Sequence, residues 1–247
     1  MENAITAGLS KQIILQRALE VTANNVANQT TTGFKAEHLA FREYIAELDT
    51  SGAQGFATDT DVSLVFDPAS YTDHSPAALQ STNGVFDFAI DGPGFFAVET
   101  GAGTQYTRDG RFSLNAFGEL VTQDGARVLD ASFSPIFIDP DAGPVVVSNT
   151  GEIQQAGTPV GTIATFDFGD LRNLDRTGSN LFTSEDVPTP VAFPILRQGF
   201  VETSNVQPIV AMTDMVEILR AYEQTSRLLE TASELSRQTV EQLSDTA

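Results

Sequence analysis

The spacing of apolar positions divides this 247-residue chain into three parts. Residues 3–28 and about 206–244 carry apolar side chains at steps of three and four, as amphipathic helices do. The stretch between them shows short apolar runs separated by turn residues, a pattern typical of strands. The sequence therefore predicts an α+β fold, in which two long terminal helices pack as a coiled-coil-like domain and an all-β domain lies between them in the chain.

The N-terminal helix is predicted to present a mostly apolar seam. Gln12 and Gln16 interrupt this seam, which is typical of packing among several helices and not of a deep single-domain core. Asn, Thr and Gly accumulate over residues 28–33, so we expect the helix to end near Asn28. The apolar members of the seam are Ile5, Leu9, Leu19, Ala23 and Val26.

The C-terminal helix is predicted to begin after Ser204-Asn205, which can supply the N-cap, with Pro208 in the first turn. No Gly or Pro interrupts residues 209–247, so the helix would be roughly 50–55 Å long. It carries two apolar rows. The first is Ile209, Met212, Val216 and Leu219; the second is Met215, Ile218, Tyr222, Leu229, Ala232 and Leu243.

The middle of the chain predicts a β-rich body from about residue 76. Turn signals at residues 91–94, 109–110 and 124–125 separate short apolar runs, as hairpin connections do, and further runs cover 144–147, 163–168 and 193–196. Upstream, residues 34–48 fit either a strand or a helical piece, 49–61 a polar loop, and Val62 to Phe66 a strand that Pro68 ends. The predicted domains are a helical assembly domain (1–34 and 206–247), a connector (35–75) and an outer β domain (76–205).

Phenylalanine and charge are both concentrated in this middle part. Fifteen of the 17 Phe residues lie between Phe56 and Phe200, which predicts a core there, with a subunit contact surface as the alternative. The net charge is −20, of which residues 1–45 contribute nothing and residues 206–247 contribute −4, so the middle carries −16. Nucleic acid is excluded as a partner, because phosphate binding needs clustered Lys and Arg. The acidic surface instead favours solubility.

The chain has no Cys, which suits a protein that crosses a membrane unfolded and works in an oxidising space. No basic segment followed by an apolar one marks a signal peptide, and no run of about 18 apolar residues exists. The sequence therefore predicts export without a cleaved signal and no direct insertion into a membrane.

Sites for chemistry are not apparent in the sequence. His38 and His74 are not in ligand spacing, and the acidic pairs at residues 59–61 and 139–141 lack the oxygen set of a calcium loop. No nucleophile elbow or phosphate-binding loop occurs, and Asp91-Gly92-Pro93-Gly94 precedes a strand instead of a helix. We expect no enzyme activity, no cofactor and no metal.

Three segments together resemble the bacterial flagellar basal-body rod and hook proteins. The first is Ala23-Asn24-Asn25-Val26-Ala27-Asn28 followed by Thr32-Gly33-Phe34-Lys35. The second runs from Phe88 to Val98 and from Tyr106 to Phe112. The third is Glu202-Thr203-Ser204-Asn205-Val206, then Met215-Val216 and Arg220-Ala221-Tyr222-Glu223. Their order along the chain makes the resemblance specific.

The resemblance implies a structural subunit that the flagellar type III apparatus exports and that polymerises with copies of itself and other rod subunits into a tube through the periplasm. The compact link between residues 45 and 80 is similar to that of proximal-rod members, since distal-rod members carry a longer insertion; a distal-rod protein is the alternative. We expect helix–helix assembly to be carried by Ile5, Leu9, Leu19, Val26, Val216, Leu219, Tyr222 and Leu229. The helix end and the turns would be set by Asn24, Asn25, Asn28, Gly33, Asp91, Gly92 and Gly94.

Two other classes of protein compete with this interpretation. A secreted β-rich adhesin whose helical ends trimerise would form a closed trimer of fixed mass, whereas a rod subunit would be a monomer with disordered ends that fold on docking. An acidic hydrolase would need a pocket that holds a carboxylate of raised pKa.

Overall fold

A computed structural model describes residues 2–40, 43–46, 62–65, 69–178 and 180–245 of the chain. These residues form two compact units. The first comprises residues 1–27, 37–71 and 207–247 and is called here the helical unit; the second comprises 28–36 and 72–206 and is called the outer unit. The predicted domain ranges stay a prediction, and the two units are described separately below.

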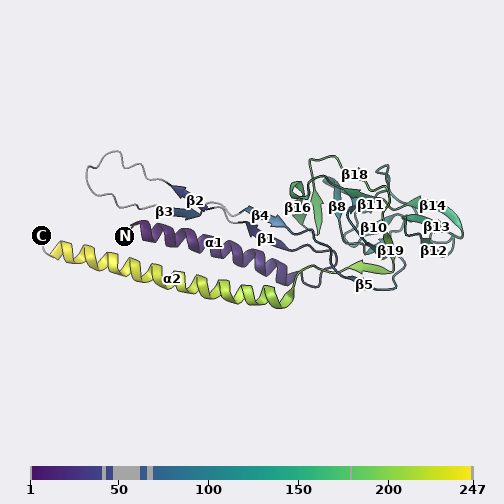
Figure 1. Ribbon diagram of the computed structural model, residues 1–247. Helices are drawn as coiled ribbons and strands as arrows, with labels where there is room; N and C mark the ends of the chain where they lie inside the picture. The colour runs from purple at the N-terminus through teal and green to yellow at the C-terminus, as the bar shows by residue number, and fades with distance from the viewer. Residues whose placement is uncertain (1, 41–42, 47–61, 66–68, 179, 246–247) are drawn as a thin grey trace. The chain divides into compact units, whose positions relative to one another are not determined.

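The helical unit is built around two long helices that pack along each other, α1 (Glu2–Ala27) and α2 (Pro208–Asp245) (Figure 1). Both terminal helices are therefore present as predicted, and α1 ends one residue before Asn28. Within the predicted range 34–48, the described residues 37–40 and 43–46 form strands, and so do the alternating residues from Val62. Strand β1 (Glu37–Ala40) pairs with β4 (Ala69–Thr72). Strand β2 (Glu43–Ala46) pairs antiparallel with β3 (Val62–Val65).

The start of α2 corrects the predicted N-cap. The helix begins at Pro208, where a missing N–H costs little, but Ser204 and Asn205 lie upstream of it. The Ser204 hydroxyl accepts a hydrogen bond from the Val206 backbone N–H (3.3 Å), and the Asn205 side chain bonds to residues of the outer unit instead. The prediction failed because a short polar side chain can satisfy distant backbone groups as well as a helix end.

The outer unit is an all-β body, as the turn spacing predicted (Figure 1). Its largest sheet follows the order β16-β17-β8-β7-β11-β10-β9, with β15 pairing β7 and β18 off this path. Smaller sheets are β12-β13-β14, β19-β6 and β20-β5. The bounds are β5 Leu79–Ser81, β6 Phe88–Ile90, β7 Phe95–Thr100, β8 Gly103–Thr107, β9 Phe112–Leu114, β10 Leu120–Thr122, β11 Arg127–Val128, β12 Val145–Val147, β13 Glu152–Gln155, β14 Thr158–Thr162, β15 Thr165–Asp167, β16 Asp175–Gly178, β17 Leu181–Thr183, β18 Thr189–Pro190, β19 Leu196–Gln198 and β20 Phe200–Glu202, with a 3₁₀ turn at Leu171–Asn173.

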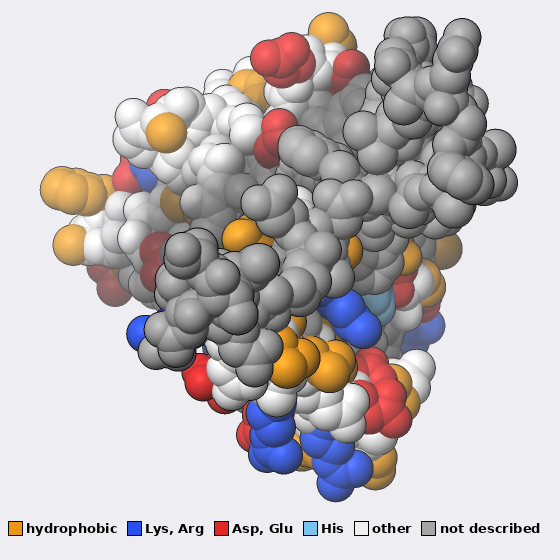
Figure 2. Space-filling view, turned by 90° about the vertical axis from the view of Figure 1, so that its left-hand side faces the viewer, with side chains coloured by type: hydrophobic (Ala, Val, Ile, Leu, Met, Phe, Trp, Pro, Cys, Tyr) orange, Lys and Arg blue, Asp and Glu red, His pale blue; other side chains and the backbone are white. Residues whose placement is uncertain are grey.

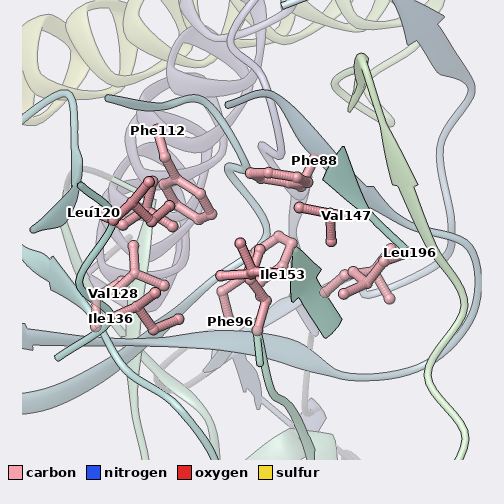
Figure 3. Close-up of a cluster of buried hydrophobic side chains, with 13 residues drawn as sticks. Phe88, Phe96, Phe112, Leu120, Val128, Ile136, Val147, Ile153 and Leu196 are labelled. Carbon is pink, nitrogen blue, oxygen red and sulfur yellow. The ribbon is translucent and has the colours of Figure 1, made fainter. Parts of the chain in front are cut away.

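Strand β7 organises the core because both of its faces are buried. Phe96 and Val98 point into one apolar cluster, shown in Figure 3, while Phe95 and Ala97 point into another. All four side chains are at most 1% exposed. Burial on both faces explains why this strand reads as a continuous apolar run and not as an alternating one. The first cluster is Phe88, Ile90, Phe96, Val98, Phe112, Leu120, Val128, Ile136, Ile138, Val147, Ile153, Ile163 and Leu196; the second is Phe95, Ala97, Tyr106, Leu129, Ala164, Phe166, Phe168, Leu174 and Phe182.

The predicted turns are present, but only one of them closes a hairpin. Asp124-Gly125 joins the antiparallel strands β10 and β11, as predicted. The turns at 91–94 and 109–110 connect strands that pair elsewhere, and Gly110 is needed because a Cβ there would stand 1.7 Å from the Phe88 carbonyl oxygen. The run at 193–196 is wrong as a strand, since β19 begins at Leu196 and Phe193 is 88% exposed. The predicted loop at 49–61 and the end of the strand at Phe66–Pro68 lie outside the described residues.

A backbone hydrogen bond joins residues 36 and 73 within the outer unit. The Asp73 backbone N–H donates to the Ala36 carbonyl oxygen at 2.8 Å. The chain therefore leaves the outer unit after residue 36 and returns to it at residue 72 at neighbouring points.

Candidate assembly interface

Residues far apart in the sequence join the two terminal helices. Gln12 on α1, predicted as a polar place in the seam, donates its side-chain amide to the Tyr222 hydroxyl (3.0 Å) and to Ser226 (3.2 Å) on α2. Gly8 faces Leu229 so closely that a Cβ at Gly8 would stand 2.7 Å from a Leu229 methyl carbon. Two residues predicted for assembly, Tyr222 and Leu229, are therefore used in packing α2 against α1 of the same chain.

The two apolar rows of α2 have different environments. In the row that includes Tyr222 and Leu229, the members from Met215 to Ala232 are partly buried, and Thr225 beside them is 5% exposed. The other row stays open: Ile209, Met212, Val216 and Leu219 are 82%, 47%, 46% and 40% exposed. Leu228 and Leu235 are also exposed, at 70% and 58%. One face of α2 thus packs on α1, and a second apolar face has no cover within the part of the chain that the structure describes.

Helix α1 has an open apolar pair as well. Leu9 is 53% exposed and Ile13 is 59% exposed, one helical turn apart. Leu19 and Val26, also predicted for assembly, are half-buried, and the side chain of Ile5 lies outside the described residues. Figure 2 shows one face of the molecule, on which apolar side chains reach the surface between acidic and basic ones. Of the seven predicted assembly residues whose side chains are described, Leu9, Val216 and Leu219 are exposed.

The Asn residues at the end of α1 have separate environments. Asn25 is buried, and its side chain both donates to the Glu37 carbonyl oxygen (2.7 Å) and accepts from the Glu37 N–H (2.9 Å). Asn28 accepts from the Thr31 hydroxyl at 3.1 Å and forms the first corner of the turn. Asn24 is exposed. Asn25 therefore joins the end of α1 to the chain at Glu37.

The predicted turn glycines have positive φ angles, which are unfavourable for residues with a Cβ. Gly33 has φ +67°, and a Cβ there would stand 2.5 Å from two backbone atoms of Arg108 and Asp109. Gly92 and Gly94 have φ +140° and +112°. Asp91, the remaining predicted turn residue, forms an ion pair with Arg197 at 2.6 Å.

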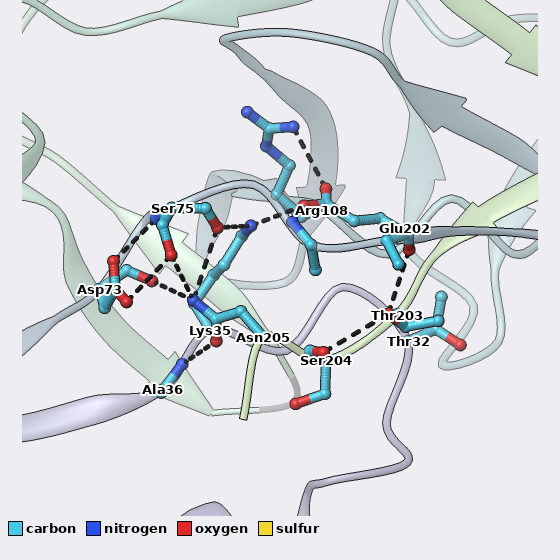
Figure 4. Close-up of polar contacts among 12 residues, drawn as sticks. Thr32, Lys35, Ala36, Asp73, Ser75, Arg108, Glu202, Thr203, Ser204 and Asn205 are labelled. Atoms are coloured by element: carbon cyan, nitrogen blue, oxygen red, sulfur yellow. Dashed lines mark hydrogen bonds and ion pairs between the residues drawn. The ribbon is translucent and has the colours of Figure 1, made fainter. Parts of the chain in front are cut away.

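A buried ion triad lies where the three signature segments of the sequence meet (Figure 4). Glu202 accepts from Lys35 Nζ at 2.7 Å and from Arg108 Nη1 at 3.2 Å. The three side chains are 1%, 0% and 6% exposed. Lys35 comes from the first signature segment, Arg108 from the second and Glu202 from the third. One residue from each of three motifs far apart in the sequence thus contributes to a single site within the outer unit, here called the junction.

Further hydrogen bonds complete the junction. Asn205 accepts from the Ala36 N–H (2.7 Å) and donates to the Asp73 carbonyl oxygen (2.8 Å), so it joins both neighbouring segments. Asn180 donates to the Thr32 carbonyl oxygen (2.7 Å). Arg176 lies over the Phe34 ring, with 4.4 Å from its guanidinium carbon to the ring centroid, and donates to the Lys35 carbonyl oxygen.

Burial shifts the pKa values of the cations at the junction. Burial lowers the pKa of Lys35, and the Glu202 carboxylate acts in the opposite direction. The pKa of Arg108 is lowered for the same reason. His74 packs edge-on against Phe95 and Phe182, and burial together with Lys35, Arg108 and Arg176 lowers its pKa from 6.5 to about 4. His74 is therefore neutral near pH 7, and three nearby cations oppose its protonation.

The junction was not predicted from the sequence, although Lys35, Arg108 and Glu202 lie within the three motifs. The available signal was only that each motif carries at least one charged residue. Charged residues that are buried nearly always have a partner of opposite sign, but the sequence did not show that these three share one site.

Neither a metal centre nor a membrane span is found in the described part of the chain. No group of three or more His, Asp or Glu side chains there is arranged to hold a metal ion. Among the described helices, none combines the length and the apolarity needed to cross a membrane.

Comparisons with known proteins agree with the resemblance. Family models match residues 5–35 (flagella basal body rod protein), 89–155 (flagellar hook protein FlgE/F/G D1 domain) and 197–243 (flagellar basal body rod FlgEFG protein C-terminal). The chain is 43% identical to the flagellar basal-body rod protein FlgF of Caulobacter vibrioides, over 98% of both chains. It is 35% identical to FlgF of Mesorhizobium japonicum, again over 98% of both. Identity to FlgG of Bacillus subtilis is 32%, over 97% of this chain and 98% of that one.

These matches cover nearly the full length of the chain and include both helices, the β body and all three segments of the junction. The chain belongs to the flagellar basal-body rod protein family, and it is a structural rod subunit of the FlgF type, not an enzyme.

Proposed function

We propose that this chain is a proximal-rod subunit that polymerises with copies of itself and with other rod subunits into the axial shaft of the basal body. The observation that carries the proposal is the open apolar row of α2, Ile209, Met212, Val216 and Leu219, of which each side chain is at least 40% exposed. The relatives named FlgF support the proximal position, and the distal rod is the alternative.

An open row of this kind favours assembly for a simple energetic reason. Complete burial of one Val, Leu, Ile or Met side chain is worth about 1.5–3 kcal/mol relative to full exposure. Four such side chains on a single helix therefore give a neighbouring helix a substantial gain in free energy. If the contact joins two different surfaces and does not close into a ring, repetition produces a helical filament.

Export by the flagellar type III apparatus, without a cleaved signal, remains part of the proposal. The absence of Cys from the sequence supports it, because thiols could be trapped in an oxidising space. The acidic composition supports it too, since like charges discourage association of the chain before export.

A substitution on the open row tests the proposal. Leu219→Asp places a charge on the row without touching the contacts of Gln12 or Gly8 with α2. We expect the variant to be exported and to be absent from purified basal bodies. Gln224→Asp is the matched control, because it places the same side chain at an exposed polar position of α2. A Leu219→Asp strain that incorporates the subunit and swims would contradict the assignment.

Mass spectrometry of purified hook–basal bodies distinguishes the alternatives. A reproducible amount of a few copies per basal body supports the proximal position, and a several-fold larger number favours the distal rod. If the chain is absent from basal bodies and forms a closed trimer of fixed mass in solution, the adhesin alternative is correct.

A further inference from the structure

Glu202 contacts both the segment that enters the outer unit (28–36) and the segment that returns to it near residue 77. Its carboxylate accepts from Lys35 Nζ (2.7 Å), from the Ala77 backbone N–H (2.9 Å) and from Arg108 Nη1 (3.2 Å). Its own carbonyl oxygen accepts from the Gly33 N–H at 2.7 Å. One residue thus holds the incoming segment 28–36, the returning segment near residue 77 and the body of the outer unit.

The incoming segment is also bonded to the outgoing segment through its backbone. Three of its backbone groups bond to the outgoing segment 200–206: the Gly33 N–H goes to the Glu202 carbonyl oxygen, the Ala36 N–H to Asn205 Oδ1 (2.7 Å), and the Phe34 carbonyl oxygen accepts from the Asn205 N–H (3.3 Å). The carbonyl oxygens of Thr32, Lys35 and Ala36 accept from other residues of the outer unit. The partners in the three bonds to segment 200–206 are separated by about 170 positions. These three bonds can therefore form only when residues 202–205 are in place.

Charge makes the Glu202 contact decisive. The triad itself contains two cations and one anion, and Glu202 is the carboxylate that contacts both cations. Asp73 and Asp167 attract Lys35 and Arg108 less than Glu202 does. If Glu202 loses its charge, Lys35 and Arg108 are left buried without the carboxylate that both contact, which is strongly unfavourable. If Lys35 loses its charge instead, Glu202 and Arg108 remain as a neutral pair.

We propose that Glu202 is a latch that closes the incoming and outgoing segments of the outer unit onto each other, so that 28–36 and 200–206 open and close as one unit. The latch joins the chain immediately after α1 to the chain immediately before α2. Its closure requires both segments, so a chain whose C-terminal segment has not yet docked leaves the N-terminal segment open.

Hydrogen exchange of the full-length chain, followed by mass spectrometry, tests the latch. In Glu202→Gln we expect exchange to become about 100-fold faster or more in both segments, the scale expected when a buried ion pair loses one partner. Exchange in β7 should be unchanged, because its hydrogen bonds lie in the central sheet. Lys35→Met should accelerate both segments by less than Glu202→Gln does.

The matched control is Asp91→Asn, which makes the same carboxylate-to-amide change in the partly exposed ion pair with Arg197. We expect it to leave exchange in both segments unchanged. The proposal is wrong if Glu202→Gln accelerates only one of the two segments, or if Lys35→Met has the larger effect.

A second variant keeps the test decisive if Glu202→Gln does not fold. Asn205→Ala removes the side-chain bonds to Ala36 and Asp73 and leaves the ion triad in place. We expect both segments to exchange faster together. Acceleration of 200–206 alone would show that the segments open independently, and would overturn the latch.

Discussion

Gln12 and Tyr222 lie 210 positions apart in the sequence, and a 3.0 Å hydrogen bond from the Gln12 amide to the Tyr222 hydroxyl joins the two terminal helices. Tyr222→Phe removes the acceptor and leaves Gln12 with Ser226. We expect the free energy of unfolding of the helix pair to fall by about 0.5–1.5 kcal/mol, the usual net value of one hydrogen bond. Urea unfolding followed by far-UV circular dichroism measures it.

The same change at Tyr71 provides the control for Tyr222→Phe. Tyr71 is 51% exposed and its ring packs on His38 at 5.6 Å. We expect Tyr71→Phe to leave the unfolding midpoint unchanged. Equal effects of the two variants would show that the Gln12 hydrogen bond contributes nothing measurable.

Gly33→Ala is expected to destabilise the outer unit by more than about 2 kcal/mol. The positive φ of Gly33 alone costs an Ala residue roughly 1–2 kcal/mol, and the new Cβ would also meet the Arg108–Asp109 backbone at 2.5 Å. Gly125→Ala isolates the first effect, because Gly125 has φ +83° with no atom within 4 Å of the new Cβ. Chemical denaturation of both variants gives the difference, and equal losses would mean that the contact is relieved at no cost.

The lowered pKa of His74 predicts that the folded chain loses stability in mild acid. Its pKa in the folded chain is about 4, below the ordinary 6.5, so between these values the unfolded chain binds a proton that the folded chain does not. Stability from this group is therefore complete above pH 6.5 and is lost as the pH falls toward 4, by about 2 kcal/mol after allowance for solvent screening.

The check on His74 is to compare the unfolding free energy of the wild type and His74→Leu at pH 7 and at pH 4.5. The difference between the two pH values should be smaller in the variant by roughly that amount. Parallel profiles, or an imidazole that titrates near pH 6.5 by NMR, would rule out the prediction.

Arg176→Lys should be costly although the charge is kept. The planar guanidinium lies over Phe34 and is 5.4 Å from the Phe182 centroid, and an ammonium group cannot stack in this way. We expect a loss of about 1–2 kcal/mol, because both the cation–π contacts and the bond to the Lys35 carbonyl oxygen change. Arg172→Lys, at a side chain that is 85% exposed, should stay within about 0.5 kcal/mol. Similar thermal midpoints for the two variants would contradict this role of Arg176.

The sequence was sufficient to predict the helices, the β body and the position of the core. Apolar periodicity set the helix limits to within two residues, and the Phe-rich middle became the two clusters around β7. Strand pairing was harder to predict. Asp109-Gly110 has the local signature of a hairpin, but the flanking strands β8 and β9 pair with β7 and β10 and not with each other. Local turn chemistry does not encode which strands meet, because pairing depends on contacts between distant residues.

The candidate site was predicted only in part for a similar reason. Spacing revealed two apolar rows on α2, but the row that packs on α1 is determined by Gly8 and Gln12 of the other helix. Tyr222 and Leu219 therefore looked equivalent in the sequence and are not. The junction escaped prediction because Lys35, Arg108 and Glu202 become one site only when three distant segments fold together.

The hydrogen bond from the Asp73 N–H to the Ala36 carbonyl oxygen has a consequence for how the family can diversify. Residues 37–71 leave and re-enter the outer unit at points that this bond holds together, so the length of the excursion is not constrained by the body that anchors it. The outer unit can therefore keep its structure when the number of residues between positions 36 and 73 changes. The strands β1 to β4, and not the outer unit, then determine which insertions and deletions the family can accept in this part of the chain.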